Sequence, residues 1–303
     1  MTGERTIEVD GRRVTLCRPD KLLFPDAGIT KGDLADYYLR VARVLLPHAR
    51  DRAISMERYP EGIEDEGFYH KAIPDHFPAW IDRATLPKQG GEITHVVIRS
   101  AATLVYLVDQ ACITPHTWPS RVDRPHRPDR LIFDLDPPED GSGGFELVRR
   151  GARALHDVLR DLGLVPFVMT TGSRGLHVVV PLERRHSFGE VRRFARELAE
   201  LLTAREPDRY TTEQRKAARG ARLFLDTLRN GYAQTVVPPY AARARPGAPV
   251  ATPLEWEELG RADLVADRFT ISNLFRRLGQ RDGDPWHDLP RRARPLGSAR
   301  RRL

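Results

Sequence analysis

Two aspartates, Asp134 and Asp136, end an apolar segment that begins at Leu131, and two prolines follow them directly. Side chains alternate along a strand, so residues two apart project from the same face and these carboxylates would lie side by side. Adjacent carboxylates repel each other, and a divalent cation with oxygen ligands relieves that repulsion. The spacing therefore indicates a metal site at a strand end. The alternative is that both aspartates are solvated caps of a loop.

A third aspartate, Asp226, also follows an apolar segment, residues 223–225. Two-metal nucleotidyl transfer commonly uses three carboxylates from neighbouring strands to hold two ions about 4 Å apart. Together with Asp134 and Asp136, Asp226 satisfies that count. Taken alone, Asp226 would more often cap a helix or a turn.

A turn of small residues, 170–175, lies between these two acidic segments in the sequence. Its glycines would let backbone N–H groups approach phosphate oxygens closely, and Ser173 and Arg174 would add further donors. His177, in the strand that follows, would project toward the same site. The pattern favours an anion-binding turn beside the carboxylates, although an ordinary hairpin turn with a surface arginine is the simpler alternative.

Alternating helical and extended segments must position these groups. Apolar residues at helical spacing and cap residues such as Ser187 with Glu190 predict helices, and short runs rich in Val, Ile, Leu and Phe predict strands. The predicted helices are 30–46, 100–112, 145–162 and 187–203, and the predicted strands are 94–98, 131–135, 166–170, 176–181, 222–225 and 234–237. Pro47 is expected to end the first helix, and a further helix is expected to open at Thr252. The alternation indicates a mixed α/β (α+β) class.

Composition narrows the class of protein. The chain has 303 residues, of which 40% are hydrophobic and 30% are charged, enough for one large core or two modest ones. No apolar run reaches the roughly 18 residues of a membrane helix, and the polar N-terminus is unlike a secretory signal. Two cysteines exclude a disulfide scaffold and a cysteine-rich zinc site. These features predict a cytoplasmic protein with no membrane partner.

The net charge of +7 comes almost entirely from residues 291–303, which hold six arginines and no acidic residue. A basic segment of this kind suggests a nucleic-acid partner. We expect residues 291–303 to be a disordered tail and residues 1–290 to form a single domain.

Three motifs in order resemble the archaeo-eukaryotic primase superfamily, and more closely the polymerase domain of bacterial ATP-dependent DNA ligase D. They are FDLDP at 133–137, GSRGLHV at 172–178 and FLDxxRN at 224–230. Further matches to that family are KxLFP at 21–25, TKG at 30–32, RYPxG at 58–62, GFYxK at 67–71 and PPYxxRxRPG at 238–247. The resemblance covers about residues 5–275.

The resemblance implies a primase-type palm, a twisted sheet flanked by helices, over about residues 126–275. An N-terminal α/β module of about residues 1–125 would pack with it. The implied activity is templated addition of NTP or dNTP to a primer 3′-hydroxyl, with two Mn²⁺ or Mg²⁺ ions, in bacterial non-homologous end joining. The implied partners are DNA ends and gaps with a 5′-phosphate, together with Ku and a separately encoded DNA ligase.

The resemblance also implies roles for individual residues. The metal ligands and catalytic residues would be Asp134, Asp136 and Asp226. The nucleotide would be bound by His116, Ser173, Arg174, Gly175, His177, Arg219, Arg229 and Arg243. DNA would be bound by Lys21, Lys31, Arg58, Phe68, Tyr69 and Lys71, with the first two lysines on the 5′-phosphate and the two aromatics stacked on the template base. Taken singly, the arginines would be solvated surface residues and the aromatics could be local core.

The sequence departs from the family pattern at Glu57 and Arg174, where lysine is frequent, and at Thr171, where serine is common. The ligase and phosphoesterase domains are absent, so we expect a free-standing polymerase or an excised domain. Two alternatives retain the same motifs: a primase that starts chains de novo, and a non-catalytic DNA-end-binding module. A haloacid-dehalogenase-type phosphatase is disfavoured because Pro138 stands where that class has threonine or valine.

Overall fold

The chain divides into two compact units, and each takes in separate parts of the sequence. The computed structural model describes residues 3–139, 141–281 and 283–303. The first unit comprises Met1–Trp118, Thr235–Ala251 and Phe269–Gly283, and the second comprises Pro119–Gln234, Thr252–Arg268 and Asp284–Leu303. The division after Trp118 lies close to the expected boundary near residue 125. The later segments that return to each unit have no counterpart in the sequence-based division.

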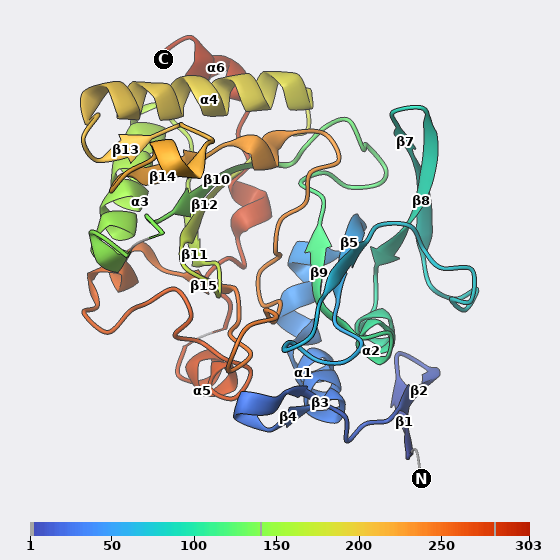
Figure 1. Ribbon diagram of the computed structural model, residues 1–303. Helices are drawn as coiled ribbons and strands as arrows, with labels where there is room; N and C mark the ends of the chain where they lie inside the picture. The colour runs from blue at the N-terminus through green and yellow to red at the C-terminus, as the bar shows by residue number, and fades with distance from the viewer. Residues whose placement is uncertain (1–2, 140, 282) are drawn as a thin grey trace. The chain divides into compact units, whose positions relative to one another are not determined.

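The second unit is built on a six-stranded sheet with the order β13-β14-β10-β12-β11-β15 (Figure 1). Every neighbouring pair is antiparallel except β13 and β14, which are parallel. The strands are β10 (Arg130–Asp136), β11 (Phe167–Thr170), β12 (Leu176–Pro181), β13 (Tyr210–Thr211), β14 (Leu223–Asp226) and β15 (Thr252–Leu254). Together with its helices, this antiparallel-rich sheet confirms the predicted mixed α/β class.

The two faces of this sheet differ because side chains alternate along each strand. Phe133 and Leu135 of β10 are fully buried on one face, whereas Asp134 projects from the other. Helix α3 (Gly144–Asp161) covers the apolar face, and at Gly151 an added Cβ would lie only 2.3 Å from Leu223 Cδ2 of β14. The sheet thus directs its carboxylates away from α3.

Helix α4 (Phe188–Arg205) also belongs to the second unit, and Val191, Phe194 and Leu198 form its buried stripe. It begins at the predicted capping box, in which Ser187 accepts from the backbone N–H of Glu190 and the Glu190 carboxylate accepts from the Ser187 backbone. Such a box satisfies two N–H groups that a helix start leaves unpaired. The predicted start of this helix is confirmed.

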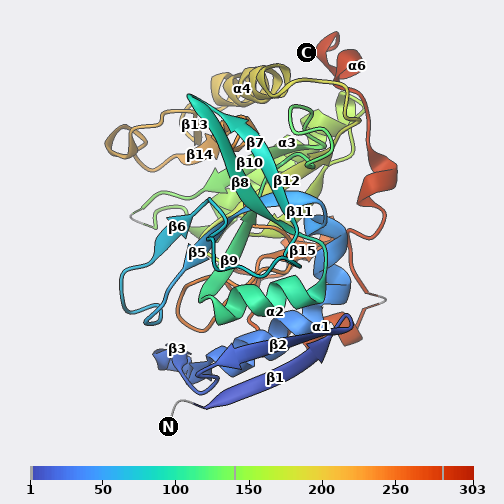
Figure 2. The same ribbon diagram turned by 90° about the vertical axis from the view of Figure 1, so that its right-hand side faces the viewer.

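The first unit combines two helices with short sheets. Helices α1 (Lys31–Ala49) and α2 (Ala101–Asp109) lie side by side next to the β1–β2 hairpin (Figure 2). A five-stranded sheet has the order β6-β5-β8-β7, and β9 pairs with β5. The strands are β1 (Glu4–Val9), β2 (Arg12–Cys17), β3 (Leu22–Phe24), β4 (Ile29–Thr30), β5 (Arg52–Arg58), β6 (Phe68–His70), β7 (Arg83–Lys88), β8 (Gly91–Ile98) and β9 (Cys112–Thr117), with helix α5 (Leu274–Gly279) near the end of the unit.

Four expectations about the elements are wrong. The strand expected over 234–237 is only an isolated bridge, from Val236 to Thr117. Pro47 lies inside α1, which continues to Ala49, because a proline in the last turn removes one hydrogen bond while the buried residues beyond it still pack. The expected helix 100–112 ends at Asp109, and Cys112 already belongs to β9, whose residues are all buried. Thr252 opens strand β15 rather than a helix, because it pairs with Thr170 of β11.

The expected disorder of residues 291–303 does not hold in the structure. This segment contains part of the 3₁₀ helix η5 (Leu289–Arg292) and helix α6 (Leu296–Arg300), which also belong to the second unit. Leu296 and Ala299 are fully buried, and backbone hydrogen bonds join Arg294 to Pro181 and Glu183. Two apolar anchors and backbone pairing therefore order the segment, while its six arginines stay exposed. No helix among the described residues is long and apolar enough to cross a membrane.

Candidate active site

Strands β10 and β14 bring the three predicted aspartates together. Asp134 lies directly opposite Asp226 in the antiparallel pair, and Asp136 follows two residues further along β10. Each of the three offers a carboxylate oxygen, and these oxygens lie within 4.8 Å of one another. Asp134 and Asp226 are each only 7% exposed. Three carboxylates in this arrangement could hold a divalent cation, since such ions take oxygen ligands.

The three carboxylates lie close enough together for their negative charges to repel one another. Burial and the neighbouring charges of Asp134 and Asp226 raise the pKa of Asp136 to about 6. Burial and the Asp134 charge also raise the pKa of Asp226, against the opposing effect of a hydrogen bond from the Leu228 backbone N–H. A bound cation would relieve this repulsion. The donor set and its charge therefore fit a divalent metal ion.

Asp134 differs from its neighbours because two basic side chains face it. His177 is its cross-strand partner on β12, with Nε2 3.4 Å from Asp134 Oδ1. Arg229 follows β14 in the 3₁₀ helix η3 (Leu228–Asn230) and donates from Nε to Asp134 Oδ2 at 3.4 Å. Burial acts to raise the pKa of Asp134, but His177 and Arg229 outweigh it and lower the pKa to about 2. The cluster thus keeps one carboxylate ionised over a wide pH range.

The turn between β11 and β12 lies beside the same strand. Thr171 closes it: its hydroxyl donates to the Gly175 carbonyl at 3.1 Å and accepts from the backbone N–H groups of Ser173 and Gly175. Gly172 adopts φ +64°, a conformation that favours glycine, and its N–H donates to the Ala266 carbonyl. These N–H groups are therefore engaged within the protein. The candidates for anion contacts in the turn are the Ser173 hydroxyl and the guanidinium of Arg174.

Two arginines of the turn and of the segment before β14 make contacts of their own. Arg174 is nearly half exposed, and its Nη2 lies 3.7 Å from Glu139 Oε1. Arg219 stacks over the ring of Phe224, 3.7 Å from its centroid, and donates to the carbonyls of Glu213 and Gln214. Both guanidiniums belong to the second unit, as do the three aspartates.

The remaining nucleotide-site candidates, His116 and Arg243, belong to the first unit. His116 is buried in β9, and its Nε2 lies 2.9 Å from Glu57 Oε2 on the neighbouring strand β5. Burial acts to raise the pKa of Glu57, but hydrogen bonds from His116 and Thr114 and the charge of Arg243 lower it overall. Glu57, which the motif comparison treated only as a departure from lysine, is the carboxylate partner of this histidine.

The two lysines expected at a 5′-phosphate lie close together, because the Lys31 N–H donates to the Lys21 carbonyl at 2.8 Å. Lys21 forms an ion pair with Glu61. Lys31 is only 4% exposed; its Nζ donates to the Asp109 carbonyl and lies 3.5 Å from Asp109 Oδ1. Burial lowers the pKa of Lys31, and Asp109 acts against that effect. Lys31 is therefore already engaged by a carboxylate.

The other DNA-site candidates lie along β5 and β6. Phe68 pairs with Arg58 across the two strands, and Tyr69 pairs with Glu57. Phe68 and Tyr69 are 45% and 57% exposed, so they are not local core. Arg58 lies over the Phe68 ring and donates to the Gln110 carbonyl, and Lys71 is exposed just after β6. Exposed rings of this kind can stack on bases.

An antiparallel palm with three clustered carboxylates on neighbouring strands, two of them buried and one half-buried, defines the class of metal-dependent nucleotidyltransferases. Within that class, the model of the family "LigD, primase-polymerase domain" matches residues 30–286, and this chain belongs to that family. The resemblance inferred from the motifs and the primase-polymerase fold are thereby confirmed.

Named relatives agree with this assignment. The chain is 34% identical over 283 residues to the multifunctional non-homologous end joining DNA repair protein LigD of Mycobacterium tuberculosis, covering 90% of this chain and 36% of that protein. It is 30% identical over 273 residues to the bifunctional non-homologous end joining protein LigD of Bacillus subtilis, covering 90% and 43%. The chain thus spans less than half the length of these relatives.

A solved structure also matches closely, the polymerase domain of Mycobacterium tuberculosis ligase D in complex with DNA. The TM-score is 0.87 at 34% sequence identity, and the match covers 93% of this chain and 99% of that one. The similarity therefore extends over a whole polymerase domain rather than a fragment of one.

Proposed function

We propose that this protein adds nucleotides, directed by a template, to a primer 3′-hydroxyl at DNA ends and short gaps in bacterial non-homologous end joining. The observation that carries the proposal is the cluster of Asp134, Asp136 and Asp226, whose oxygens lie within 4.8 Å of one another on strands β10 and β14. The family match and the DNA-bound structural relative support it. The activity would take place in the cytoplasm, with Ku and a separately encoded ligase as partners.

The three aspartates would hold two divalent ions, Mn²⁺ or Mg²⁺. Such ions, when bound, stabilise charge on the reacting phosphate and activate the attacking hydroxyl. Asp134 would remain ionised at all working pH values, because His177 and Arg229 hold its pKa at about 2. The pKa values of Asp136 and Asp226 are raised by burial and by neighbouring negative charge. A bound cation would offset that charge, so both residues would bind it as ionised carboxylates.

The nucleotide would be oriented by side chains around that cluster. On the β12 side, the Ser173 hydroxyl, Arg174 and His177 would contact the triphosphate, with Gly175 permitting the close approach of the turn to β10. Arg219 and Arg229 of the second unit would neutralise further phosphate charge. The family resemblance also assigns nucleotide contacts to His116 and Arg243 of the first unit, where Glu57 would orient His116.

DNA would be bound by the first unit. The exposed rings of Phe68 and Tyr69 would stack on the template base at the break. Lys21 would contact the 5′-phosphate across a gap by exchanging its partner Glu61, and Lys31 would support that contact from its place beside Lys21. Arg58 and Lys71 would bind further phosphates of the DNA backbone.

The test is extension of a labelled primer on a templated gap with a downstream 5′-phosphate, in Mn²⁺ or Mg²⁺, with ribo- or deoxyribonucleotides. We expect templated addition of one or a few nucleotides, stimulated by the phosphate. Asp134→Asn and Asp226→Asn should reduce extension to background without weakening DNA binding. The exposed Asp267, which lies in the same unit, gives a matched control in Asp267→Asn.

Other outcomes would change the proposal. Substantial extension by Asp134→Asn or Asp226→Asn would refute the carboxylate assignment. Extension indifferent to the 5′-phosphate would retain the polymerase and remove the role of Lys21. Efficient synthesis on a template without any primer would instead indicate a de novo primase. DNA binding without any extension by the unaltered chain would indicate an end-binding module.

A further inference from the structure

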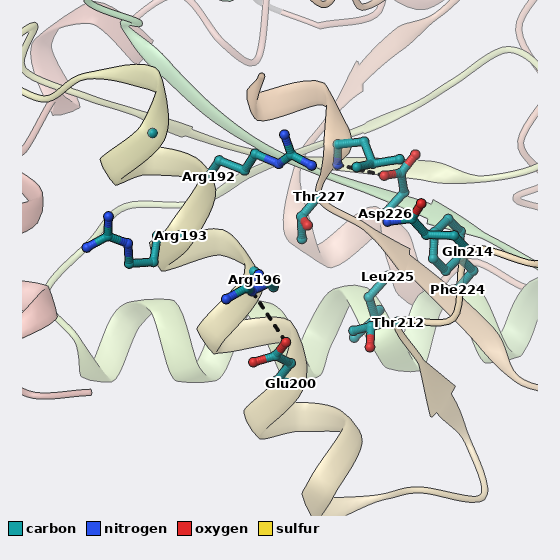
Figure 3. A pocket seen from close by; sticks show the side chains of 12 residues that line it. Arg192, Arg193, Arg196, Glu200, Thr212, Gln214, Phe224, Leu225, Asp226 and Thr227 are labelled. Carbon is teal, nitrogen blue, oxygen red and sulfur yellow. Dashed lines mark hydrogen bonds and ion pairs between the residues drawn. The ribbon is translucent and has the colours of Figure 1, made fainter. Parts of the chain in front are cut away.

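A second feature of the second unit lies on the other side of Asp226 from β10. A pocket of about 440 Å³ opens between helix α4 and the segment from β14 to η3 (Figure 3). Its walls are Gly189, Arg192, Arg193, Arg196 and Glu200 of α4, Thr212 and Gln214 after β13, and residues 224–228. Asp226 therefore faces both the carboxylate cluster and this pocket. Neither the motifs nor the family resemblance assigns any role to the α4 side chains.

The chemistry of the pocket suits an anion. Three arginines line it against the carboxylates of Glu200 and Asp226. Among the described residues, Arg192 and Arg193 have no acidic partner, and Arg196 shares an exposed ion pair with Glu200 at 3.4 Å. An exposed pair of this kind is weak and can be exchanged for another anion. Hydroxyl and amide groups of the other wall would add neutral donors.

The positive charge of the pocket comes from side chains rather than from the start of the helix. The first turn of α4 is closed by the capping box of Ser187 and Glu190, so the backbone N–H groups of these two residues already have partners. Val191 and Phe194 are buried and hold the helix against the unit, which places the intervening arginines at the surface. Figure 3 shows Arg192 reaching from α4 toward the strand that carries Asp226, whereas Arg193 points away from it.

The strand order of the six-stranded sheet indicates which part of the substrate the pocket would bind. Strand β10 lies between β12 and β14, so His177 and the turn before β12 flank the carboxylates on one side and the α4 pocket flanks them on the other. Transfer of a nucleotidyl group requires the attacking and leaving oxygens to lie on opposite sides of the phosphorus. If the triphosphate lies on the β12 side, the attacking 3′-hydroxyl must come from the β14 side.

We propose that this pocket binds backbone phosphates of the primer strand just before its 3′-hydroxyl, through Arg192 and Arg196. The inference rests on the proposed polymerase function and deepens it by assigning the primer a side of the sheet and two named contacts. Guanidiniums bind phosphate oxygens with paired hydrogen bonds and read no base sequence, which suits an enzyme that must accept any primer end.

The first experiment compares the full chain with Arg192→Gln, Arg196→Gln and the double variant. Arg153→Gln is the matched control, because Arg153 is exposed on α3 of the same unit and does not line the pocket. The KM for primer–template should rise about tenfold or more in the double variant, because a hydrogen bond to a charged group contributes at least that factor. The KM for the nucleotide should stay unchanged, and Arg153→Gln should match the unaltered chain.

Salt dependence gives an independent readout from equilibrium binding of a labelled primer–template. For each phosphate that a variant no longer neutralises, the slope of log affinity against log salt should fall by about 0.7 to 0.9. A thermal melt of each variant shows that the exposed substitutions leave the fold intact. Equal KM values and equal salt slopes in the double variant and the control would overturn the inference.

The strand assignment is tested by altering the DNA. Replacing the last two primer phosphates with neutral methylphosphonates should weaken DNA binding by the unaltered chain as much as the double substitution weakens it. The same replacement should not weaken DNA binding by the double variant any further. If neutral linkages in the template show this coupling instead, the pocket binds the template strand and the proposal is wrong. A rise in the nucleotide KM alone would place the triphosphate in the pocket, which also refutes it.

Failure of the wider function would look different. If the unaltered chain extends no primer under any condition, the proposed polymerase function fails, whatever the arginines bind. If the unaltered chain extends primers and the double variant matches Arg153→Gln, only the assignment of the α4 pocket fails. The two failures are thus separated by the behaviour of the unaltered chain.

Discussion

Gly175 is the position at which one added methyl group should slow catalysis strongly while the protein still folds. It ends the turn that carries Ser173 and Arg174, and it lies against β10 between the two aspartates of that strand. A Cβ built on Gly175 would lie 2.0 Å from the Leu135 carbonyl oxygen and 3.1 Å from its carbon. The backbone of Gly175 is not in the left-handed region, so Gly175→Ala tests this close approach alone.

The size of the effect follows from that distance. Ordinary van der Waals contact begins at 3.4 Å, so the turn and β10 must separate by about 1.4 Å. The obstructing atoms are backbone, which cannot rotate away as a side chain could. Misplacing a reacting group by about 1 Å can reduce a rate by about 100-fold, and overpacking of this kind typically costs about 1–3 kcal/mol of folding free energy. We therefore expect Gly175→Ala to fold with reduced stability and to extend primers about 100-fold more slowly.

The assay is single-turnover extension at saturating DNA and nucleotide, with a thermal melt of the same samples. Gly260→Ala is the control, because Gly260 lies in the same unit and an added Cβ there meets nothing within 4 Å. DNA binding by Gly175→Ala should equal that of the control. Extension at the unaltered rate would refute the reasoning that the spacing between the turn and β10 positions the site. A loss of rate that only matches the unfolded fraction would show an effect on stability instead.

Three further predictions concern the helix cap, the carboxylates and the phosphate contact. Ser187→Ala should lower the free energy of unfolding by about 1 kcal/mol in urea titrations, because it removes the side-chain cap of α4; an unchanged midpoint would contradict this. The pKa of Asp136 is raised in the folded state to about 6, so without metal its contribution to stability is full below pH 3.8 and is lost as the pH rises through 6. In EDTA, the melting temperature of Asp136→Asn should therefore rise relative to that of the unaltered chain as the pH increases from 3.8 to about 6. Added Mn²⁺ should raise the melting temperature of the unaltered chain only. Parallel pH profiles of the two proteins would refute this. Lys21→Gln should weaken binding to gaps with a 5′-phosphate and not to unphosphorylated gaps, and it is a cleaner probe than Lys31, whose removal takes the cationic partner from the Asp109 carboxylate; equal weakening on both substrates would contradict it.

The carboxylate cluster could be predicted from the sequence because its signal is local. Two aspartates spaced two apart after an apolar run must share a face of a strand, and the structure places them there. Asp226 could be added because it also ends an apolar run. That Asp226 lies directly opposite Asp134, rather than elsewhere on the sheet, depends on strand pairing between segments far apart in the chain. Spacing alone carries no information on that register.

Other features escaped because their causes are not local. Strand β9 is buried on both sides, so it lacks the alternation that marks a half-buried strand. The Glu57–His116 contact arises from the pairing of β5 with β9. The arginine-rich segment looks disordered by composition, but Leu296 and Ala299 find buried places that composition cannot show. The α4 pocket could not be predicted either, because it depends on which strand end lies next to the helix.

The interleaving of the two units has a consequence for how the chain is made. The backbone passes from one unit to the other five times, after residues 118, 234, 251, 268 and 283. Residues 235–251 supply fully buried side chains to the first unit, including Tyr240 and Val250. At about 5–20 residues per second, a ribosome needs roughly 10 to 30 s after Trp118 before residue 283 emerges. During synthesis, therefore, the core of the first unit stays incomplete while most of the second unit is produced. Because each unit consists of three separate segments, neither can be expressed alone as one continuous fragment.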